Sequence, residues 1–224
     1  GYARRYRPNR ADDSLSAGTG RESAVRFPHQ TNPPGNRTRA SMALKATVFK
    51  ADLSVADIDR GYYHDHALTL ARHPSETDER MMVRLLAFAL HADDALAFGR
   101  GLSAEDEADL VRRDLTGAVE LWIDVGLPDE RDLRKACGRS PEVHVYAYGG
   151  RACALWWEKA GPALARQPSL VVHEVPQEAS RALAALAART MKLQCTIQDG
   201  HVFVSDGERT AAVELRTFKA AGDQ

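Results

Sequence analysis

Hydrophobic and polar residues alternate in two segments at the start of the regular part of the chain. In residues 44–55, "LKATVFKADLSV", and residues 62–73, "YYHDHALTLARH", similar side chains recur at every second position. This period of two is typical of β-strands. The sequence therefore predicts one strand in each segment, and Pro74 ends the second.

A helical period follows directly. Residues 76–92, "ETDERMMVRLLAFALHA", carry an apolar stripe at helical spacing, formed by Met82, Leu85, Leu86 and Ala89. Ser75 is the predicted N-cap, and Asp78 follows it by three residues. Glu79 lies at the N-terminal end of the stripe, so we expect its side chain on the buried side of the helix and not opposite it.

Strand-like and helix-like segments then alternate along the chain. Residues 107–128 divide at Thr116-Gly117 into two short strands, which we expect to form a hairpin. The pattern next predicts a helix over 129–138, a strand over 142–149, a helix over 151–165, a strand over 169–175 and a helix over 177–189. Three strands follow, with hairpin turns at Asp199-Gly200 and Asp206-Gly207. This order predicts an α/β (α+β) fold, with one mixed β-sheet flanked by helices and antiparallel hairpins at the C-terminal end.

Residues 1–41 differ in composition from the rest of the chain. They contain eight Arg, three acids and no Lys, are rich in Pro, Gly, Ser and Asn, and show no hydrophobic period. We expect this segment to be a disordered basic extension, and residues 42–224 to form a single domain. Two interpretations stay open: the segment precedes the folded protein's own start at Met42, or it is a basic arm that contacts phosphates. Residues 42–224 carry 22 Lys and Arg against 28 Asp and Glu, which argues against broad electrostatic binding of DNA.

Composition excludes several other classes of protein. The three cysteines, Cys137, Cys153 and Cys195, are far apart and form no CxxC pair, so neither a zinc site nor a disulfide framework is indicated. No apolar run reaches 18 residues, so we expect no membrane span. The N-terminal residues lack the apolar core of a secretory signal. Together these features favour a cytoplasmic protein.

Two acids interrupt the otherwise apolar segment "VELWIDV", residues 119–125. Because side chains alternate along a strand, Glu120 and Asp124 share one face, and Asp124 lies at the C-terminal end, where sites of α/β proteins usually lie. The next predicted helix is rich in Arg and carries Lys135. If the two strands of 107–128 pair, Asp109 comes to the same end of the sheet as Asp124. Converging carboxylates beside a Lys are typical of sites for Mg²⁺ and a phosphate.

The chain from Met42 to Lys219 resembles the YaeQ family in three segments: "HPSETDERMMVRLLAFALHA", "LTGAVELWIDVGLPDERDLRKA" and "VHVYAYG". The resemblance implies the restriction-endonuclease-like core of the PD-(D/E)XK superfamily, with the element order α-β-β-β-α-β. Many members of this fold have degenerate sites, so fold and activity are separate expectations.

The nuclease motif of that superfamily is altered in this sequence. Its Pro-Asp falls on Ala108-Asp109, so the proline is absent. Its (D/E)XK triplet falls on residues 124–126, where Gly126 takes the place of the lysine. The resemblance implies that Lys135 supplies the missing cation and that Glu79 is the acid of the first core helix.

We therefore expect a Mg²⁺- or Mn²⁺-dependent phosphodiesterase that acts on nucleic acid. Asp109, Asp124 and Glu79 would hold the metal ion, and Lys135 would position the attacking water or stabilise charge in the transition state. The alternative is a non-catalytic, regulatory member of the fold that binds nucleic acid or protein. The altered triplet and the acidic domain favour the alternative, while the surviving acids favour the nuclease. The sequence gives no indication of the oligomeric state.

Each candidate also has a purely structural interpretation. Asp124 would cap a turn, Asp109 would belong to the acidic run that begins at Glu105, Lys135 would lie on a solvated helix face, and Glu79 would interact with the helix dipole. Glu120 is expected to be an ion-pair partner. His64 and His66 share a strand face without an evident third metal ligand, and His144 and His173 are expected to be structural.

Overall fold

The computed structural model of the protein describes residues 46–99 and 107–222. The basic extension predicted over residues 1–41 lies outside the described residues. Within them, four helices are present: α1 (Asp78–Leu90), α2 (Glu130–Arg139), α3 (Arg151–Leu164) and α4 (Gln177–Ala184). The strands are β1 (Thr47–Asp57), β2 (Tyr62–Arg72), β3 (Leu96–Phe98), β4 (Leu110–Arg113), β5 (Val119–Val125), β6 (Glu142–Ala147), β7 (Leu170–Glu174), β8 (Thr190–Gln198), β9 (His201–Ser205), β10 (Thr210–Glu214) and β11 (Arg216–Lys219).

The strands form two mixed sheets, where the sequence predicted one. The first sheet has the order β10-β9-β8-β1-β2, and its only parallel pair is β1 with β8. The second has the order β11-β7-β6-β5-β4-β3, with β5, β6 and β7 parallel and the other pairs antiparallel. The prediction of a single sheet was wrong because β1 joins a strand about 140 residues further along, a pairing that no local pattern contains.

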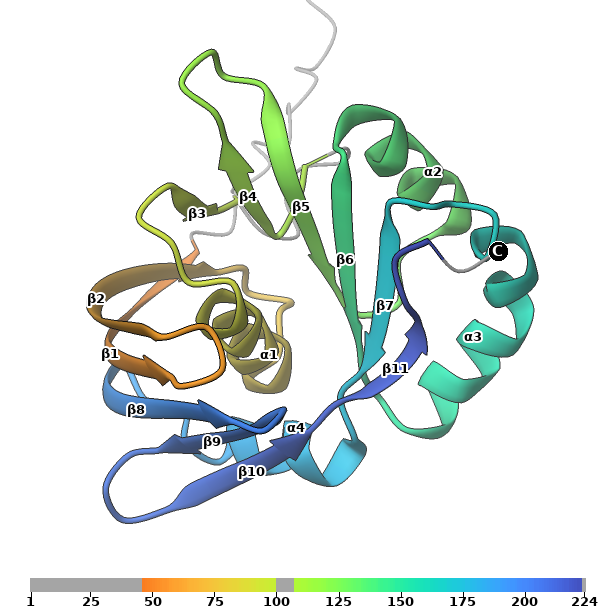
Figure 1. The fold of residues 1–224 in the computed structure, drawn as a ribbon. Coiled ribbons are helices and arrows are strands. Elements are labelled where there is room, and N and C mark those ends of the chain that lie inside the picture. The colour runs from red at the N-terminus through yellow and green to blue at the C-terminus, as the bar shows by residue number, and fades with distance from the viewer. Residues whose placement is uncertain (1–45, 100–106, 223–224) are drawn as a thin grey trace, which may run out of the picture. The chain divides into compact units, whose positions relative to one another are not determined.

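Helix α1 lies between the two sheets, and α2 and α3 cover the far face of the six-stranded sheet (Figure 1). All nine residues from Met81 to Ala89 are buried. The sequence predicted one apolar stripe, whereas a helix that is enclosed on all sides is apolar around its whole circumference. Full burial of each large apolar side chain contributes about 1.5–3 kcal/mol, so packing of α1 contributes substantially to the stability of the core between the sheets.

Several element boundaries differ from the prediction. The N-cap of α1 is Thr77, whose side chain accepts a hydrogen bond from the Arg80 backbone N–H, and not Ser75. The hairpin of β4 and β5 is present, as are both turns of the C-terminal region. That region forms four strands where three were predicted, because the chain leaves the first sheet after β10 and enters the second as β11. The short strand β3 was not predicted.

None of the helices in the described part of the chain has the length and apolar character needed to cross a membrane.

Gly99 positions the start of β4, and with it Asp109. Its backbone N–H donates a hydrogen bond to the Asp109 carbonyl at 2.8 Å. A Cβ atom built at Gly99 would lie 2.0 Å from the Ala108 carbonyl oxygen. Since that neighbour is backbone, no side-chain rotation relieves the clash. Gly99 therefore permits an approach of the two chain segments that no other residue allows.

We predict that Gly99→Ala lowers the free energy of unfolding by about 1–3 kcal/mol, the usual cost of overpacking. Gly138→Ala is the matched control, because Gly138 lies in α2 with open space around its Cβ position. There alanine should stabilise the helix by about 0.5–1 kcal/mol. Urea unfolding of the three proteins measures both effects. Equal stability of Gly99→Ala and the parent would contradict the proposed close approach.

Candidate functional site

A cavity of about 590 Å³ lies at the C-terminal end of β5. Its wall includes three of the four predicted site residues, Asp109, Asp124 and Lys135. Strand β5 ends here, and Gly126, with a φ of 108°, turns the chain toward α2. Asp129 then caps α2 by accepting a hydrogen bond from the Arg131 backbone N–H. The local sequence thus brings a strand end, a tight turn and a helix to one place.

Pairing of β4 with β5 accounts for the proximity of the two aspartates. Leu110 opposes Ile123 in the antiparallel register. Asp109 and Asp124 are the next residues outward, at the open end of the hairpin. The Asp109 charge is close enough to add to the effect of burial in raising the pKa of the Asp124 carboxyl. The hairpin therefore places the two acids side by side, as the segment 107–128 suggested.

Asp124 is a half-buried acid that burial disfavours in its ionised form. Burial is the largest cause that raises its pKa, to about 7. The nearby Trp122 indole favours the charged form but does not complete a hydrogen bond, because its buried Nε1 has no partner among the described residues. A carboxyl group that titrates near neutral pH is suited to exchange protons or to bind a cation.

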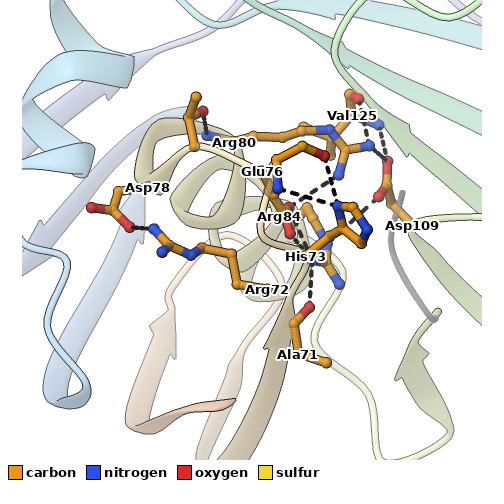
Figure 2. A network of polar contacts seen from close by, with 11 residues as sticks. Ala71, Arg72, His73, Glu76, Asp78, Arg80, Arg84, Asp109 and Val125 are labelled. Atoms are coloured by element: carbon orange, nitrogen blue, oxygen red, sulfur yellow. Dashed lines mark hydrogen bonds and ion pairs between the residues drawn. The ribbon is translucent and has the colours of Figure 1, made fainter. Parts of the chain in front are cut away.

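Asp109 is held by arginines (Figure 2). Its Oδ2 accepts hydrogen bonds from Arg80 Nη2 and from the Val125 backbone N–H, both at 2.8 Å. Its Oδ1 lies 3.5 Å from Arg84 Nε. Burial raises the pKa of Asp109, although the charges of Arg80 and Arg84 oppose that effect. This carboxylate therefore has partners on both oxygens.

A buried acid that the sequence analysis did not identify completes this network. Glu76 is buried, and its Oε1 accepts hydrogen bonds at 3.0 Å from both Arg80 Nη1 and Arg84 Nη1. Arg84 has no exposed surface, and its guanidinium also lies 5.5 Å from the Phe98 ring centroid. The signal was present in the sequence as Glu76, Arg80 and Arg84 at steps of four, from the turn before α1 into its apolar part.

Arg80 connects this buried network to the cavity. Besides Glu76 and Asp109, it donates a hydrogen bond to the Val125 carbonyl at 3.2 Å. Burial alone would lower its pKa, but Asp109 and Glu76 raise it overall. A positive charge is therefore fixed permanently at the wall of the cavity, beside the end of β5.

Helix α2 contributes two further cations to the wall of the cavity. Lys135 and Arg139 line the cavity, and Lys135 Nζ lies 3.2 Å from Asp132 Oδ1. The Lys135 side chain is 40% exposed, so it keeps room to contact a bound anion. The cavity is thus lined by acids from the hairpin and by cations from α1 and α2.

Glu79 is separated from the other predicted residues. Its Oε1 accepts a hydrogen bond from Ser180 Oγ at 2.6 Å, which joins α1 to α4. Glu79 is not among the residues that line the cavity. Glu120, predicted to be an ion-pair partner, lies 3.4 Å from Arg112 Nε.

Two carboxylates at this cavity, those of Asp124 and Asp109, are of the chemical type that could hold a Mg²⁺ or Mn²⁺ ion. In proteins Mg²⁺ is usually held by one or two carboxylates together with waters and substrate phosphates. Asp124 supplies a carboxylate without a guanidinium partner among the described contacts, and Asp109 supplies a second whose oxygens are shared with arginines. Glu79 would join this set only by leaving Ser180.

Comparison with known proteins gives one consistent result. A sequence model of the family described as "YaeQ protein" matches residues 42–215. "Uncharacterized protein YaeQ" of Salmonella typhi is 47% identical over 178 residues, which cover 80% of this chain and 98% of the relative. The protein of the same name from Escherichia coli K12 is 46% identical over the same shares.

Two crystal structures resemble the fold. YaeQ protein from Xanthomonas axonopodis pv. citri is 53% identical, with a TM-score of 0.76 over 78% of this chain and 99% of that one. YaeQ protein from Pseudomonas syringae is 39% identical, with a TM-score of 0.75 over 78% and 97%.

The buried network should dominate stability around the site. We predict that Glu76→Gln lowers the free energy of unfolding by about 3–5 kcal/mol, because it leaves buried arginine charge uncompensated. Glu120→Gln, which breaks an exposed pair with Arg112, should cost less than about 1 kcal/mol. Urea unfolding at neutral pH measures both values. Similar losses in the two variants would show that burial does not govern this network.

Asp124 should make stability depend on pH. Its folded pKa of about 7 exceeds the ordinary 3.8, so the folded state binds the proton more tightly than the unfolded state does. The contribution of Asp124 to the free energy of unfolding therefore falls as the pH rises from about 4 to about 7. At about 1.4 kcal/mol per pKa unit, Asp124→Asn should be more stable than the parent at pH 8.5, by at most about 4 kcal/mol.

The same substitution should have little effect on stability near pH 4, where both carboxyl and carboxamide are neutral in the folded state. Urea unfolding of the two proteins across this pH range measures the difference. A stability difference that does not change with pH would mean that Asp124 has an ordinary pKa.

Proposed function

This chain belongs to the YaeQ family, and we propose that it is a metal-dependent phosphodiesterase acting on nucleic acid in the cavity at the end of β5. The observation that carries the proposal is the convergence of Asp109, Asp124 and Lys135 around one cavity. Acids and cations gathered at a strand end are suited to bind a phosphate through a divalent ion and to stabilise charge that develops on it.

The order of the elements supports a restriction-endonuclease-like core as part of this proposal. From α1 onward the chain forms α1, β3, β4, β5, α2 and β6. This is the α-β-β-β-α-β order that the sequence resemblance implies. Asp109 precedes β4 and Asp124 lies near the end of β5, and this position of two acids at strand ends supports the proposal.

The chain's own residues would divide the work in the following way. Asp124 and Asp109 would hold Mg²⁺ or Mn²⁺, which supplies charge neutralisation at the phosphate and activation of water. Lys135 and Arg139 bind phosphate oxygens from the α2 side. Arg80 and Arg84 fix the orientation of the Asp109 carboxyl, and their charges oppose the rise in its pKa that burial causes. Recognition is local, because residues 42–224 carry a net charge of −6 and attract no polyanion over long range.

One observation favours a second candidate function, a non-catalytic binding member of the same fold. Arg80 bridges Asp109 Oδ2 and the Val125 carbonyl, so a guanidinium already provides positive charge where the two acids meet. A site that keeps this arrangement binds an anionic partner without hydrolysing it. The two functions differ in their response to a divalent ion.

We predict that millimolar Mn²⁺ raises the melting temperature of the full-length protein. An ion that binds the folded state alone stabilises it by about 2.7 kcal/mol at one hundred times its dissociation constant. For a chain of this size that is a rise of about 5–10 °C. The rise should disappear in Asp124→Asn and persist in Glu120→Gln, a change to another acid of the same strand. No rise in the parent, or an equal rise in Asp124→Asn, would contradict the metal site.

Hydrolysis of labelled single-stranded and duplex DNA and RNA separates the two functions. A phosphodiesterase should release product with Mn²⁺, and Lys135→Met should abolish release while keeping the melting-temperature rise. A melting-temperature rise without any product would favour the binding function.

A further inference from the structure

A second cluster of chemically reactive side chains lies on the other face of the six-stranded sheet. Strand β6 directs Val143 and Val145 into the apolar layer with α2 and α3. Glu142, His144 and Tyr146 alternate with these residues and therefore face the side on which α1 lies. His91, the C-cap residue of α1, packs against them with its ring centroid 4.4 Å from that of His144. This cluster takes no part in the cavity at the end of β5.

Three side chains of this cluster lie close together. His91, Glu142 and His144 each offer a ligand atom, and these atoms all lie within 4.8 Å of one another. His144 Nε2 is 2.9 Å from Glu142 Oε1, and His91 Nε2 is 2.7 Å from the Tyr146 hydroxyl. The residues come from two elements that are more than 50 positions apart in sequence, so the fold and not the local chain brings them together.

Burial leaves part of this cluster without a hydrogen-bond partner. His144 is 9% exposed, and its buried Nδ1 has no partner among the described residues. Buried polar atoms are normally paired, so His144 has hydrogen-bonding capacity that no described residue uses, while its other ring nitrogen, Nε2, already contacts Glu142 Oε1.

A third imidazole lies next to the cluster. The His173 ring stacks on that of His144, with the two ring centroids 5.9 Å apart.

We propose that His91, His144 and Glu142 form a binding site for a transition-metal ion of the Zn²⁺ type. Two imidazole nitrogens and one carboxylate oxygen are a common set of three protein ligands for Zn²⁺, with a fourth position left for water or another ligand. Mg²⁺ prefers oxygen ligands alone, so this site and the Asp124 cavity select different ions. Zn²⁺ distances of about 2.0–2.2 Å require the three groups to close slightly. The Glu142 side chain is 47% exposed and has the freedom to do so.

Hydrogen bonds around the cluster would act as its outer shell. Tyr146 contacts His91 through its hydroxyl, and Thr217 Oγ1 lies 3.2 Å from His173 Nδ1. Such partners fix ring orientation in known metal sites. A bound ion would also tie the end of α1 to β6.

A second histidine cluster provides an internal comparison. His64 and His66 of β2 meet Asp94, the third ligand that the sequence did not reveal, with His64 Nε2 3.8 Å from Asp94 Oδ1. His64 and Asp94 are largely exposed, at 51% and 87% of their side-chain surfaces. Ligands that are largely exposed to water hold an ion less firmly than buried ones. We therefore place the metal site at His91, His144 and Glu142, and use His64 as the control.

The test is a Zn²⁺ titration of the full-length protein after removal of metal by a chelator. We expect about one tightly held ion, with affinity that falls in Glu142→Gln and in His91→Gln by more than the 10- to 100-fold typical of losing an outer-shell partner. His64→Ala and the exposed-residue control His201→Ala should keep the parent affinity. Glu142→Gln retains shape at a half-exposed position, so it tests the site even if a histidine variant fails to fold.

Co²⁺ replacing Zn²⁺ reports on the ligands directly. We expect visible d–d bands without a sulfur-to-cobalt charge-transfer band, since no cysteine belongs to the cluster. Affinity unchanged in both Glu142→Gln and His91→Gln, affinity lost in His64→Ala, or a thiolate band would each overturn the proposal. Asp124→Asn should leave Zn²⁺ binding intact, so failure of the phosphodiesterase proposal and failure of this one can be distinguished.

Discussion

The Arg84 guanidinium of α1 is completely buried, and this burial constrains the positions of the residues around the candidate site. An arginine without exposed surface is tolerated only where acids compensate its charge. Glu76 does so from the turn before α1, and Asp109 does so from the start of β4. Arg80 also forms ion pairs with Glu76 and Asp109, and it donates a further hydrogen bond to the Val125 carbonyl. Through these bonds α1, β4 and β5 have one mutual arrangement, and that arrangement determines where the cavity lies.

The same bonds give the two aspartates different chemistry. Asp109 has guanidinium partners and a backbone N–H partner, which fix the orientation of its carboxylate at the strand end. Asp124 is half-buried and has no arginine bonded to it among the described contacts, so its carboxyl titrates near neutral pH. Two acids that are adjacent across one hairpin thereby differ in role, because their partners differ and not because their residue type does. On the other face of the six-stranded sheet, β6 directs the His144 imidazole toward α1.

Local patterns in the sequence predicted most helices and strands, and the strand face that carries Asp124. They succeeded wherever a period of two or 3.6 was undisturbed, as in β5, β6 and α3. They could not show that β1 pairs with β8 or that the strands form two sheets, since both facts depend on segments that are distant in the sequence. Arg80 and Arg84 were missed because an arginine within an apolar helix looks like a solvated charge until its buried partners are known. Glu79 was assigned to the metal site by resemblance, whereas its nearest partner is Ser180 on α4.

The parallel pairing of β1 with β8 also has a consequence for how the protein folds. Strand β1 is complete early in synthesis, yet its second neighbour in the sheet is made about 140 residues later. Until then the hairpin of β1 and β2 has an open edge, which is a template for wrong pairing with other chains. Contacts between segments so distant in sequence slow folding, because the loop must close before the pair gains energy. In a nascent chain of this fold, the edge of β1 that later pairs with β8 therefore stays open until about 140 more residues have been made.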